Sequence, residues 1–301
     1  MVSRPASRLM SAPDGLLVVD KPPDWTSHDV VGRCRRLAGT RKVGHAGTLD
    51  PMATGVLVVG VGRATRLLGH LALSTKGYDA TVRLGQATVS DDAQGEVTRT
   101  ADTRDVTSDA IEATVARFVG EIEQVPSAVS AIKVNGERAY KRVRSGEQVV
   151  LAARPVTVSQ LDILEVRRFD AFVDVDLHVE CSTGTYVRAL ARDIGANLGV
   201  GGHVTALRRT RVGPYGLDQV HTLEELAHDL TVVSLEDAAT ANFNTHTVDA
   251  DSVALVRNGR TLPIDLGGPG NVAVMGPEGE FLALYEQRGD TAHAVAVFAP
   301  A

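Results

Sequence analysis

The sequence has few residues of the kinds that build disulfide frameworks or metal sites. Its 301 residues include two cysteines, Cys34 and Cys181, which are too few for a disulfide framework or a cysteine-based zinc site. We interpret both as buried thiols. The nine histidines form neither an HExxH nor a His-x-His pattern, so the sequence predicts no metal.

Long apolar runs are also missing. The longest, residues 55–61, has the length of a strand and falls far short of the ~18–20 residues that a membrane helix needs. Residues 1–14 contain no apolar stretch of signal-peptide length. We therefore expect a cytoplasmic protein, with no membrane partner, whose residues 1–14 form a flexible tail.

Positive charge is in short supply, but it is unevenly spread. The whole chain carries a net charge of −6, which alone argues against a nucleic-acid partner. Residues 218–301 contain 13 acidic and three basic residues, whereas residues 1–217 contain 24 acidic and 28 basic ones. A polyanion is thus expected to bind the first 217 residues and not the acidic remainder.

Apolar periodicity predicts an alternation of strands and helices in the first 217 residues. We expect a helix that Ser27 caps and Gly39 ends, and another that Thr107 or Ser108 caps and that extends to Ile122. A third helix should follow the turn at residues 183–185 and end at Gly199. The glycine-rich residues 43–55 are expected to be loop throughout. The expected strands cover residues 15–20, 56–61, 78–84 and 173–181.

The pattern changes after residue 217. Residues 222–225 resemble a capping box, and Ser234 marks a second helix start. Short alternating strands are expected near residues 272–275, 281–285 and 294–298. The sequence therefore predicts an α+β catalytic domain over residues 15–217, followed over residues 218–301 by a helical linker and a small β-rich domain.

One segment stands out chemically. Residues 44–55 read GHAGTLDPMATG and present Asp50 on a loop that glycines and Pro51 constrain. A carboxylate held in this way loses little entropy when it is aimed at a ligand. A helix-capping or turn aspartate is the common alternative in such a context, and spacing alone does not exclude it.

The same segment resembles the signature of the TruB family of tRNA pseudouridine synthases, roughly G-H-x-G-[TA]-L-D-P-x-A-x-G. Further motifs of this family follow in order over residues 15–216. They include DKP at 20–22, KGY at 76–78, QVPSAVSAIK at 124–133, RP at 154–155, CSTGTYVRAL at 181–190 and LRR at 207–209. In the segment around Asp92, Gln94 replaces an acidic residue of the family, and the acidic tail matches the family's PUA domain poorly.

This resemblance implies a pseudouridine-synthase fold: a large mixed, mostly antiparallel sheet flanked by helices and loops, plus a small C-terminal β-rich, PUA-like domain. It implies isomerisation of uridine to pseudouridine at position 55, in the TΨC stem-loop of tRNA, without a cofactor. The enzyme is expected to act as a monomer without an obligate protein partner.

The resemblance also implies roles for individual residues. Asp50 would be the catalytic carboxylate, Arg188 would pair with it, and Tyr78 would lie against the target uracil. A neighbouring cation keeps a carboxylate ionised, so we expect the pKa of Asp50 to be low. The target base must leave the RNA stack, and His45 would fill the gap. Tyr186 and Leu207 would form the walls of the pocket.

Contacts with RNA are expected from basic side chains in two short segments. Five lie within residues 133–144, and Arg208, Arg209 and Arg211 form a second group. A run of charge is commonly just a solvated surface, but both runs lie in the positive part of an acidic chain. The full set assigned to substrate or RNA binding is Lys21, His45, Asp92, Lys133, Arg144, Arg154, Tyr186, Leu207, Arg208 and Arg209.

Three other functions were weighed. A catalytically silent RNA-binding protein would explain the basic segments but not the constrained Asp50. A nucleotide-cofactor enzyme would use Gly60 and Gly62, but Thr65 stands where the third glycine belongs. A glycosidase needs two carboxylates at the scissile bond, and Asp92 is the one candidate for the second.

Overall fold

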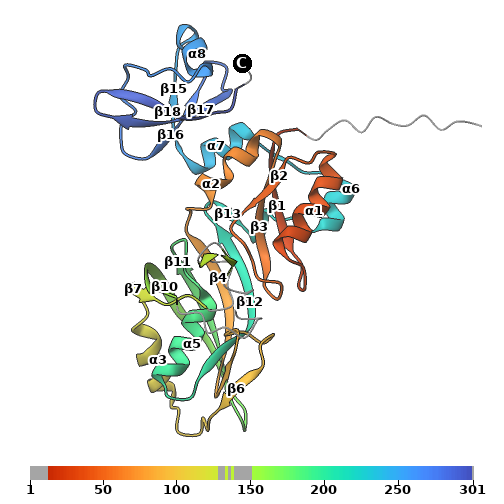
Figure 1. The fold of residues 1–301 in the computed structure, drawn as a ribbon, viewed down its shortest axis with the longest axis vertical. Helices are drawn as coiled ribbons and strands as arrows, with labels where there is room; N and C mark the ends of the chain where they lie inside the picture. The colour runs from red at the N-terminus through yellow and green to blue at the C-terminus, as the bar shows by residue number, and fades with distance from the viewer. Residues whose placement is uncertain (1–12, 128–132, 135–136, 139–150, 300–301) are drawn as a thin grey trace, which may run out of the picture.

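The computed structural model describes residues 13–127, 133–134, 137–138 and 151–299 (Figure 1). The molecule is elongated, with a small β-rich domain at one end in Figure 1 and a longer sheet with its helices filling the rest. In the described part of the chain, no helix has both the length and the apolarity to span a membrane.

Ten strands of the described chain form one sheet along this longer part. They are β1 (Gly15–Lys21), β2 (Val43–Ala46), β3 (Thr54–Val61), β4 (Lys76–Leu84), β7 (Gly120–Gln124), β10 (Arg154–Arg168), β11 (Val173–Cys181), β12 (Gly202–Val212), β13 (Tyr215–Gly216) and β14 (Val233–Ser234). Eight lie in the order β14-β1-β3-β12-β4-β11-β10-β7, while β2 pairs with β3 and β13 with β12. All neighbours are antiparallel except β3 and β12. The predicted mixed, mostly antiparallel sheet is confirmed.

Helices cover this sheet where the sequence is amphipathic. Below in Figure 1, α5 (Val187–Asn197) packs against β12 and β4, and α3 (Ser108–Ala116) packs against β10. At the other end of the sheet, α1 (Ser27–Ala38) and α6 (Leu223–His228) lie beside β1 and β3. The other helices within the described residues are η1 (Gly62–Arg66), α2 (Leu68–Leu71), η2 (Leu217–Gln219), α7 (Leu235–Asn242) and α8 (Ala250–Arg257). Two two-stranded hairpins complete this part: β5 (Gln86–Thr88) with β6 (Val97–Thr100), and β8 (Lys133–Val134) with β9 (Glu137–Arg138).

Several predicted boundaries were wrong. Thr26, not Ser27, caps α1 and accepts a hydrogen bond from the backbone of Asp29. The helix predicted to reach Ile122 ends at Ala116, and Ile122 lies in β7 opposite Val156 of β10. Residues 43–46, predicted as loop, form β2, because their partner β3 supplies the hydrogen bonds.

The β-rich domain begins after the helical linker. It consists of β15 (Asn244–Thr247), β16 (Asn271–Met275), β17 (Phe281–Arg288) and β18 (Thr291–Val297), with α8 beside them. The three predicted C-terminal strands correspond to β16, β17 and β18. The linker itself belongs physically to the larger sheet, since β14 pairs with β1 and α6 contacts α1.

The two parts share a core. One cluster of buried side chains joins Leu16 and Val56 of the large sheet to Met275, Phe281 and Phe298 of the β-rich domain. Polar contacts reinforce this junction: the Arg63 guanidinium donates to the Phe298 carbonyl at 2.8 Å. The β-rich domain is therefore joined to the large sheet, with α7 in contact with β1 on one side and with β15 and β17 on the other.

Gly55 fixes the position of the glycine-rich loop at the start of β3. Its φ is +96°, and a Cβ at this position would lie 2.2 Å from the backbone oxygen of Arg209 on the neighbouring β12. We expect Gly55→Ala to lower the free energy of unfolding by about 3 kcal/mol or more, because both the backbone angle and the strand contact are violated. Urea unfolding monitored by circular dichroism measures this loss.

Gly32→Ala is the matched control. Gly32 lies in α1, and no atom comes within 4 Å of a Cβ added there. This change should leave stability equal or raise it by about 0.5–1 kcal/mol, since alanine favours a helix interior. Equal effects of the two substitutions would contradict the assigned role of Gly55.

Candidate active site

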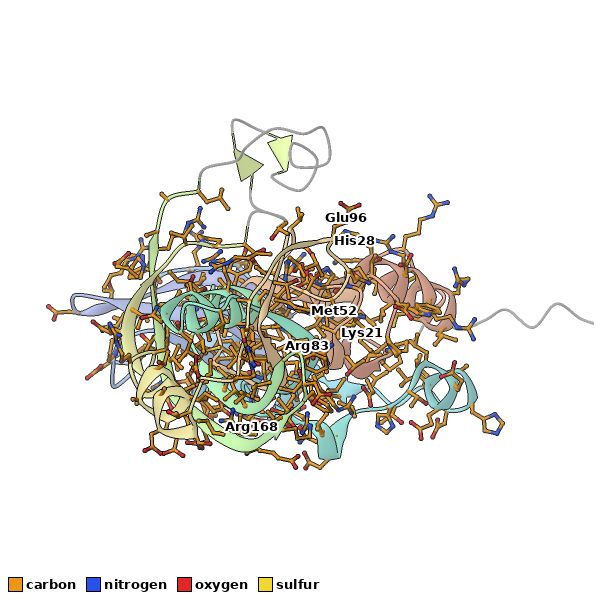
Figure 2. All side chains as sticks on the ribbon, turned by 90° about the horizontal axis from the view of Figure 1, so that it is seen from below. Lys21, His28, Met52, Arg83, Glu96 and Arg168 are labelled. Carbon is orange, nitrogen blue, oxygen red and sulfur yellow. The ribbon has the colours of Figure 1, made fainter. Side chains whose placement is uncertain are left out.

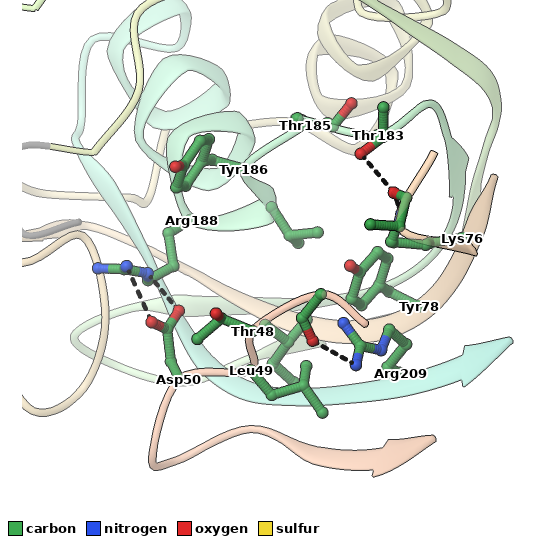
Figure 3. Close-up of a pocket in the computed structure, with 15 residues that line it drawn as sticks. Thr48, Leu49, Asp50, Lys76, Tyr78, Thr183, Thr185, Tyr186, Arg188 and Arg209 are labelled. Atoms are coloured by element: carbon green, nitrogen blue, oxygen red, sulfur yellow. Dashed lines mark hydrogen bonds and ion pairs between the residues drawn. The ribbon is translucent and has the colours of Figure 1, made fainter. Parts of the chain in front are cut away.

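A pocket of about 290 Å³ opens beside the glycine-rich loop, at the lower end of the ~300–1,000 Å³ of small-molecule sites (Figure 3). Four segments far apart in the sequence form it: the loop before Pro51, the entry into β4, the turn before α5, and β12. The lining residues are Gly47, Thr48, Leu49, Asp50, Ala72, Lys76, Tyr78, Thr183, Gly184, Thr185, Tyr186, Val187, Arg188, Leu207 and Arg209.

The loop that carries Asp50 is fixed from behind by two polar side chains. Lys21 is fully buried, and its ammonium donates to the carbonyls of Pro22 at 2.9 Å and Pro51 at 3.0 Å. Burial lowers its pKa to about 8. The Ser27 hydroxyl accepts from the backbone N–H of Leu49 at 2.9 Å and donates to its carbonyl at 3.2 Å. These bonds hold the residues on both sides of Asp50.

Figure 2 shows the setting of this support: Lys21 and Met52 lie within the molecule, whereas His28 and Glu96 lie at its edge. Lys21 was predicted to bind substrate or RNA. The structure places its ammonium on backbone carbonyls, where it helps to position the loop.

Arg188 lies between two carboxylates. Its Nε is 2.9 Å from Oδ2 of Asp50, and its Nη1 is 3.3 Å from Oδ2 of Asp92. Nη1 also donates to the Ser90 carbonyl at 2.7 Å. Arg188 is only 4% exposed, while the Asp50 side chain is 37% exposed and faces the pocket. The pairing of Asp50 with Arg188 predicted from the sequence is present.

The direction of the Asp50 pKa differs from the prediction. Burial raises the pKa of Asp50 above its ordinary value, and the nearby Asp92 carboxylate raises it further, while Arg188 acts in the opposite direction. The sequence suggested a low pKa from the arginine alone. It could not reveal how deeply the loop is buried or that a second carboxylate shares the guanidinium.

Two aromatic side chains and one leucine shape the pocket. Tyr78 on β4 is buried and faces the cavity, and burial raises the pKa of its phenol. Tyr186 is held through its backbone: its N–H donates to the Gln124 side chain at 2.8 Å, and its carbonyl accepts from the same amide at 3.1 Å. Leu207 on β12 completes the wall. Sequence reasoning assigned all three lining residues to the site.

Lys76 was missed as a site residue. It lies two residues before Tyr78, hence on the same face of β4, and it lines the pocket. Its ammonium donates to the carbonyls of Ala72 at 3.0 Å and Ser74 at 2.8 Å. The period of two along the strand was the signal that could have identified it. Nothing in the sequence indicated its burial.

The three arginines of β12 do not form one basic surface. Arg208 forms an ion pair with Asp20 at 2.8 Å, and Arg211 pairs with Glu180. Arg209 is buried and donates to the Val56 carbonyl at 2.7 Å and the Gly47 carbonyl at 3.1 Å. The three arginine side chains thus contact different partners. Their proximity in sequence therefore did not imply joint contact with phosphate.

The other predicted RNA contacts are less fully described. Arg154 begins β10 and is exposed, as a residue available to phosphate must be. Lys133 is placed by its backbone in β8, and Arg144 lies outside the described residues.

His45 lies on β2, partly buried, with its ring edge-to-face against His28 at 5.6 Å between centroids. Burial lowers its pKa, which favours the neutral imidazole. Among the described residues, no three His, Cys, Asp or Glu side chains converge on a point where they could hold a metal ion.

Three family models match the chain in succession. The model described as "TruB family pseudouridylate synthase (N terminal domain)" matches residues 35–187. "tRNA pseudouridylate synthase B C-terminal domain" matches residues 188–246, and "tRNA Pseudouridine synthase II, C terminal" matches residues 243–299. The last boundary coincides with the start of the β-rich domain at β15.

Curated relatives and solved structures agree with these models. A protein of Arthrobacter sp. (strain FB24) named tRNA pseudouridine synthase B is 56% identical over 95% of this chain and 97% of its own length. One of Rhodococcus jostii (strain RHA1) with the same name is 56% identical over 99% and 97%. The structure titled "Crystal Structure of a Cbf5-Nop10-Gar1 Complex" contains a chain 28% identical to this one, with a TM-score of 0.73, covering 95% of this chain and 85% of that one.

Proposed function

The chain belongs to the TruB family of pseudouridylate synthases and forms pseudouridine in tRNA, and from this premise we propose that its target is uridine 55 of the TΨC loop and its catalytic carboxylate is Asp50. The position of Asp50 is the observation that supports its assignment as the catalytic carboxylate. Its side chain is the partly exposed carboxylate of a pocket that also presents Tyr78, and a buried guanidinium aims it.

The pocket suits a single base that has left its stack. Its volume of about 290 Å³ has no room for a stacked duplex, so the target nucleotide must turn out of the tRNA before it enters. With uracil against Tyr78, the sugar would lie toward Asp50. His45, on the strand that precedes the Asp50 loop, would then lie next to the vacated stack.

The reaction is an isomerisation. The N1–C1′ bond of uridine breaks, and the electron-poor C1′ forms beside the Asp50 carboxylate. The uracil turns within the pocket and C5 attacks C1′. The C5 proton leaves and N1 gains a proton, so that no atom is added or lost overall. The carboxylate must be ionised for this role, and Arg188 favours that form.

The proposal is tested with tRNA transcripts that carry tritium on C5 of uracil. We expect the enzyme to release about one tritium per tRNA, because the C5 proton leaves when the new bond forms. A transcript with cytidine in place of uridine 55 should release none. Release from the substituted transcript would contradict the position, and an absence of release from the unsubstituted one would contradict the activity.

The same experiment separates the alternative. A catalytically silent RNA-binding protein would retain the tRNA on a filter without any release of tritium. The cytoplasmic location and the monomeric state stay predictions, and so do direct RNA contacts of Asp92, Lys133, Arg144, Arg154 and Arg208.

A further inference from the structure

Two buried cations on the pocket wall lack a carboxylate partner among the described residues. Lys76 is 6% exposed and Arg209 is 1% exposed, and both line the pocket. Lys76 donates to the carbonyls of Ala72 and Ser74, and Arg209 donates to the carbonyls of Val56 and Gly47. Arg209 also hydrogen-bonds the phenol of Tyr78, which is not a carboxylate. Burying a charge without an opposite charge is costly. Two such cations side by side suggest that an anion occupies the space before them.

Both cations have donors to spare. An ammonium carries three N–H groups, of which Lys76 uses two in the described structure, and a guanidinium carries five. The bonds of Arg209 to carbonyls use Nε and Nη2. Its Nη1 lies 3.5 Å from the point where a Cβ on Gly47 would be, and Cε of Lys76 lies 3.4 Å from the same point. A Cβ on Gly47 would therefore touch both cations at van der Waals distance, so glycine at this position leaves the two cations uncovered by a side chain from the loop.

The neighbours of Lys76 do not neutralise it. Its charged and titratable neighbours are Arg209, which disfavours its charged form, and the thiol of Cys181. Burial raises the pKa of that thiol to about 11, so it is protonated at neutral pH. Together with Arg209, burial lowers the pKa of Lys76 to about 8, which leaves most of it charged at pH 7.

The position of the two cations indicates which part of a nucleotide they would meet. In Figure 3, Asp50 and Arg188 lie on one side of the pocket, while Lys76 and Arg209 lie on the opposite side next to Tyr78. In the orientation proposed above, the sugar is toward Asp50 and the base is toward Tyr78. The groups that reach Lys76 and Arg209 are then the carbonyl oxygens of uracil.

We propose that Lys76 and Arg209 bind the carbonyl oxygens of the target uracil and stabilise the negative charge that the base acquires when its N1–C1′ bond breaks. This inference rests on the proposed function. The electron pair of the broken bond goes to N1 and spreads over O2 and O4, while C1′ becomes electron-poor. The pocket would thus present cations to the base and a carboxylate to the sugar, so both developing charges meet a fixed opposite charge.

Lys76→Met tests the proposal. Removing one fixed donor from a developing anion typically costs about 10²–10³ in rate, and we expect a fall of that order in the single-turnover rate. The affinity for tRNA should change by less than about threefold, since the contact strengthens in the transition state. Lys76→Arg should recover part of the rate because it restores a cation. Lys42→Met, which removes an exposed lysine outside the pocket, is the control and should behave as wild type.

A substrate with a better leaving group distinguishes charge stabilisation from mere support of the turn at residues 72–75. Fluorine on C5 makes uracil more acidic, so 5-fluorouracil needs less help to carry charge. With tRNA that contains 5-fluorouridine at position 55, the reaction is measured as the loss of 5-fluorouridine from nuclease digests. Lys76→Met should slow this reaction by a factor at least about tenfold smaller than the factor by which it slows the reaction of uridine. A purely structural role predicts equal slowing of both reactions and would overturn the inference.

The remaining outcomes are also decisive. A wild-type rate in Lys76→Met refutes the inference and leaves the proposed function intact. A weakened tRNA affinity with an unchanged rate, and a salt dependence reduced by about one phosphate contact, would assign Lys76 to the backbone of the RNA instead. A wild-type enzyme that releases no tritium would refute the proposed function itself.

Discussion

Replacement of Asp50 by asparagine should abolish tritium release from tRNA, with a fall in rate of about 10⁴-fold or more. Loss of this size is typical when the one side chain that attacks or deprotonates the substrate is removed. Asparagine has nearly the same shape as aspartate, so Pro51, Ser27 and Lys21 can still hold the loop. It cannot supply the negative charge that C1′ needs.

Affinity separates a chemical defect from a folding defect. Filter binding should show that Asp50→Asn keeps its tRNA affinity within about threefold of wild type, because the lost interaction belongs to the transition state. Asp109→Asn serves as the control, since Asp109 lies exposed in the first turn of α3 and should leave the rate unchanged. Tritium release by Asp50→Asn at the wild-type rate would end the assignment of Asp50.

Arg188→Met should be the second most damaging change, because it removes charge and support together. It leaves Asp50 and Asp92 without the cation that both of them contact, and it frees the Ser90 carbonyl from its donor. Breaking a buried pair such as that of Arg188 with Asp92 typically costs about 3–5 kcal/mol of stability. We expect a loss of that order in urea unfolding at pH 7, with a fall in rate of at least about 10²-fold.

The pH dependence of Arg188→Met follows from the direction of the Asp50 pKa. Burial and Asp92 already raise this pKa, and Arg188 opposes them, so removing the arginine raises it further. The proposed reaction needs the ionised carboxylate, and therefore the acid limb of the rate profile should move to higher pH. When folding raises the pKa of a carboxyl group, that group's contribution to the stability of the folded protein falls as the pH rises through the raised pKa. The destabilisation should thus be largest at neutral pH and shrink in acid.

Asp92→Asn should shift the pKa of Asp50 in the opposite direction. Without the second carboxylate the pKa of Asp50 should fall, and the acid limb should move to lower pH. In the double variant with Arg188→Met, part of the lost stability should return because one of the two unpaired charges is gone. Acid limbs that coincide in wild type, Asp92→Asn and Arg188→Met would contradict the coupling between the three side chains.

The elements that sequence predicted well are those whose signals are local. The apolar alternation around Tyr78 and from Val173 onward is visible within nine residues, and the capping box at Thr222 needs only four. Strand β2 has no such signal. Its four residues include one glycine, and what makes them a strand is pairing with β3 across a loop of seven residues. Helix α3 was extended too far because Ile122 fits its apolar period but belongs to β7, which pairs with β10.

The residues of the site likewise differ in how well local sequence signals predicted them. The motif around Asp50 identified a loop that lines the pocket, and the family motif that contains Arg188 identified its partner 138 positions away. Burial could not be read in this way. Lys21, Arg208 and Arg209 were assigned to substrate or RNA binding as basic residues, and nothing in the sequence showed that Lys21 and Arg209 are buried against backbone carbonyls or that Arg208 is paired with Asp20. Lys76 was overlooked because a lysine at the start of an alternating strand suggests a solvated end.

The uneven distribution of charge along the sequence also separates charge between the two ends of the folded molecule. Residues 218–301, with 13 acidic and three basic side chains, form α6, α7 and the β-rich domain, and these lie toward the upper end of the molecule in Figure 1. The protein therefore has a permanent electric dipole. An approaching polyanion experiences a torque as well as an attraction, and the torque turns the acidic end away before contact. Because a Debye length is only about 8 Å at physiological ionic strength, this alignment acts in the last steps of diffusion and fades as salt is added.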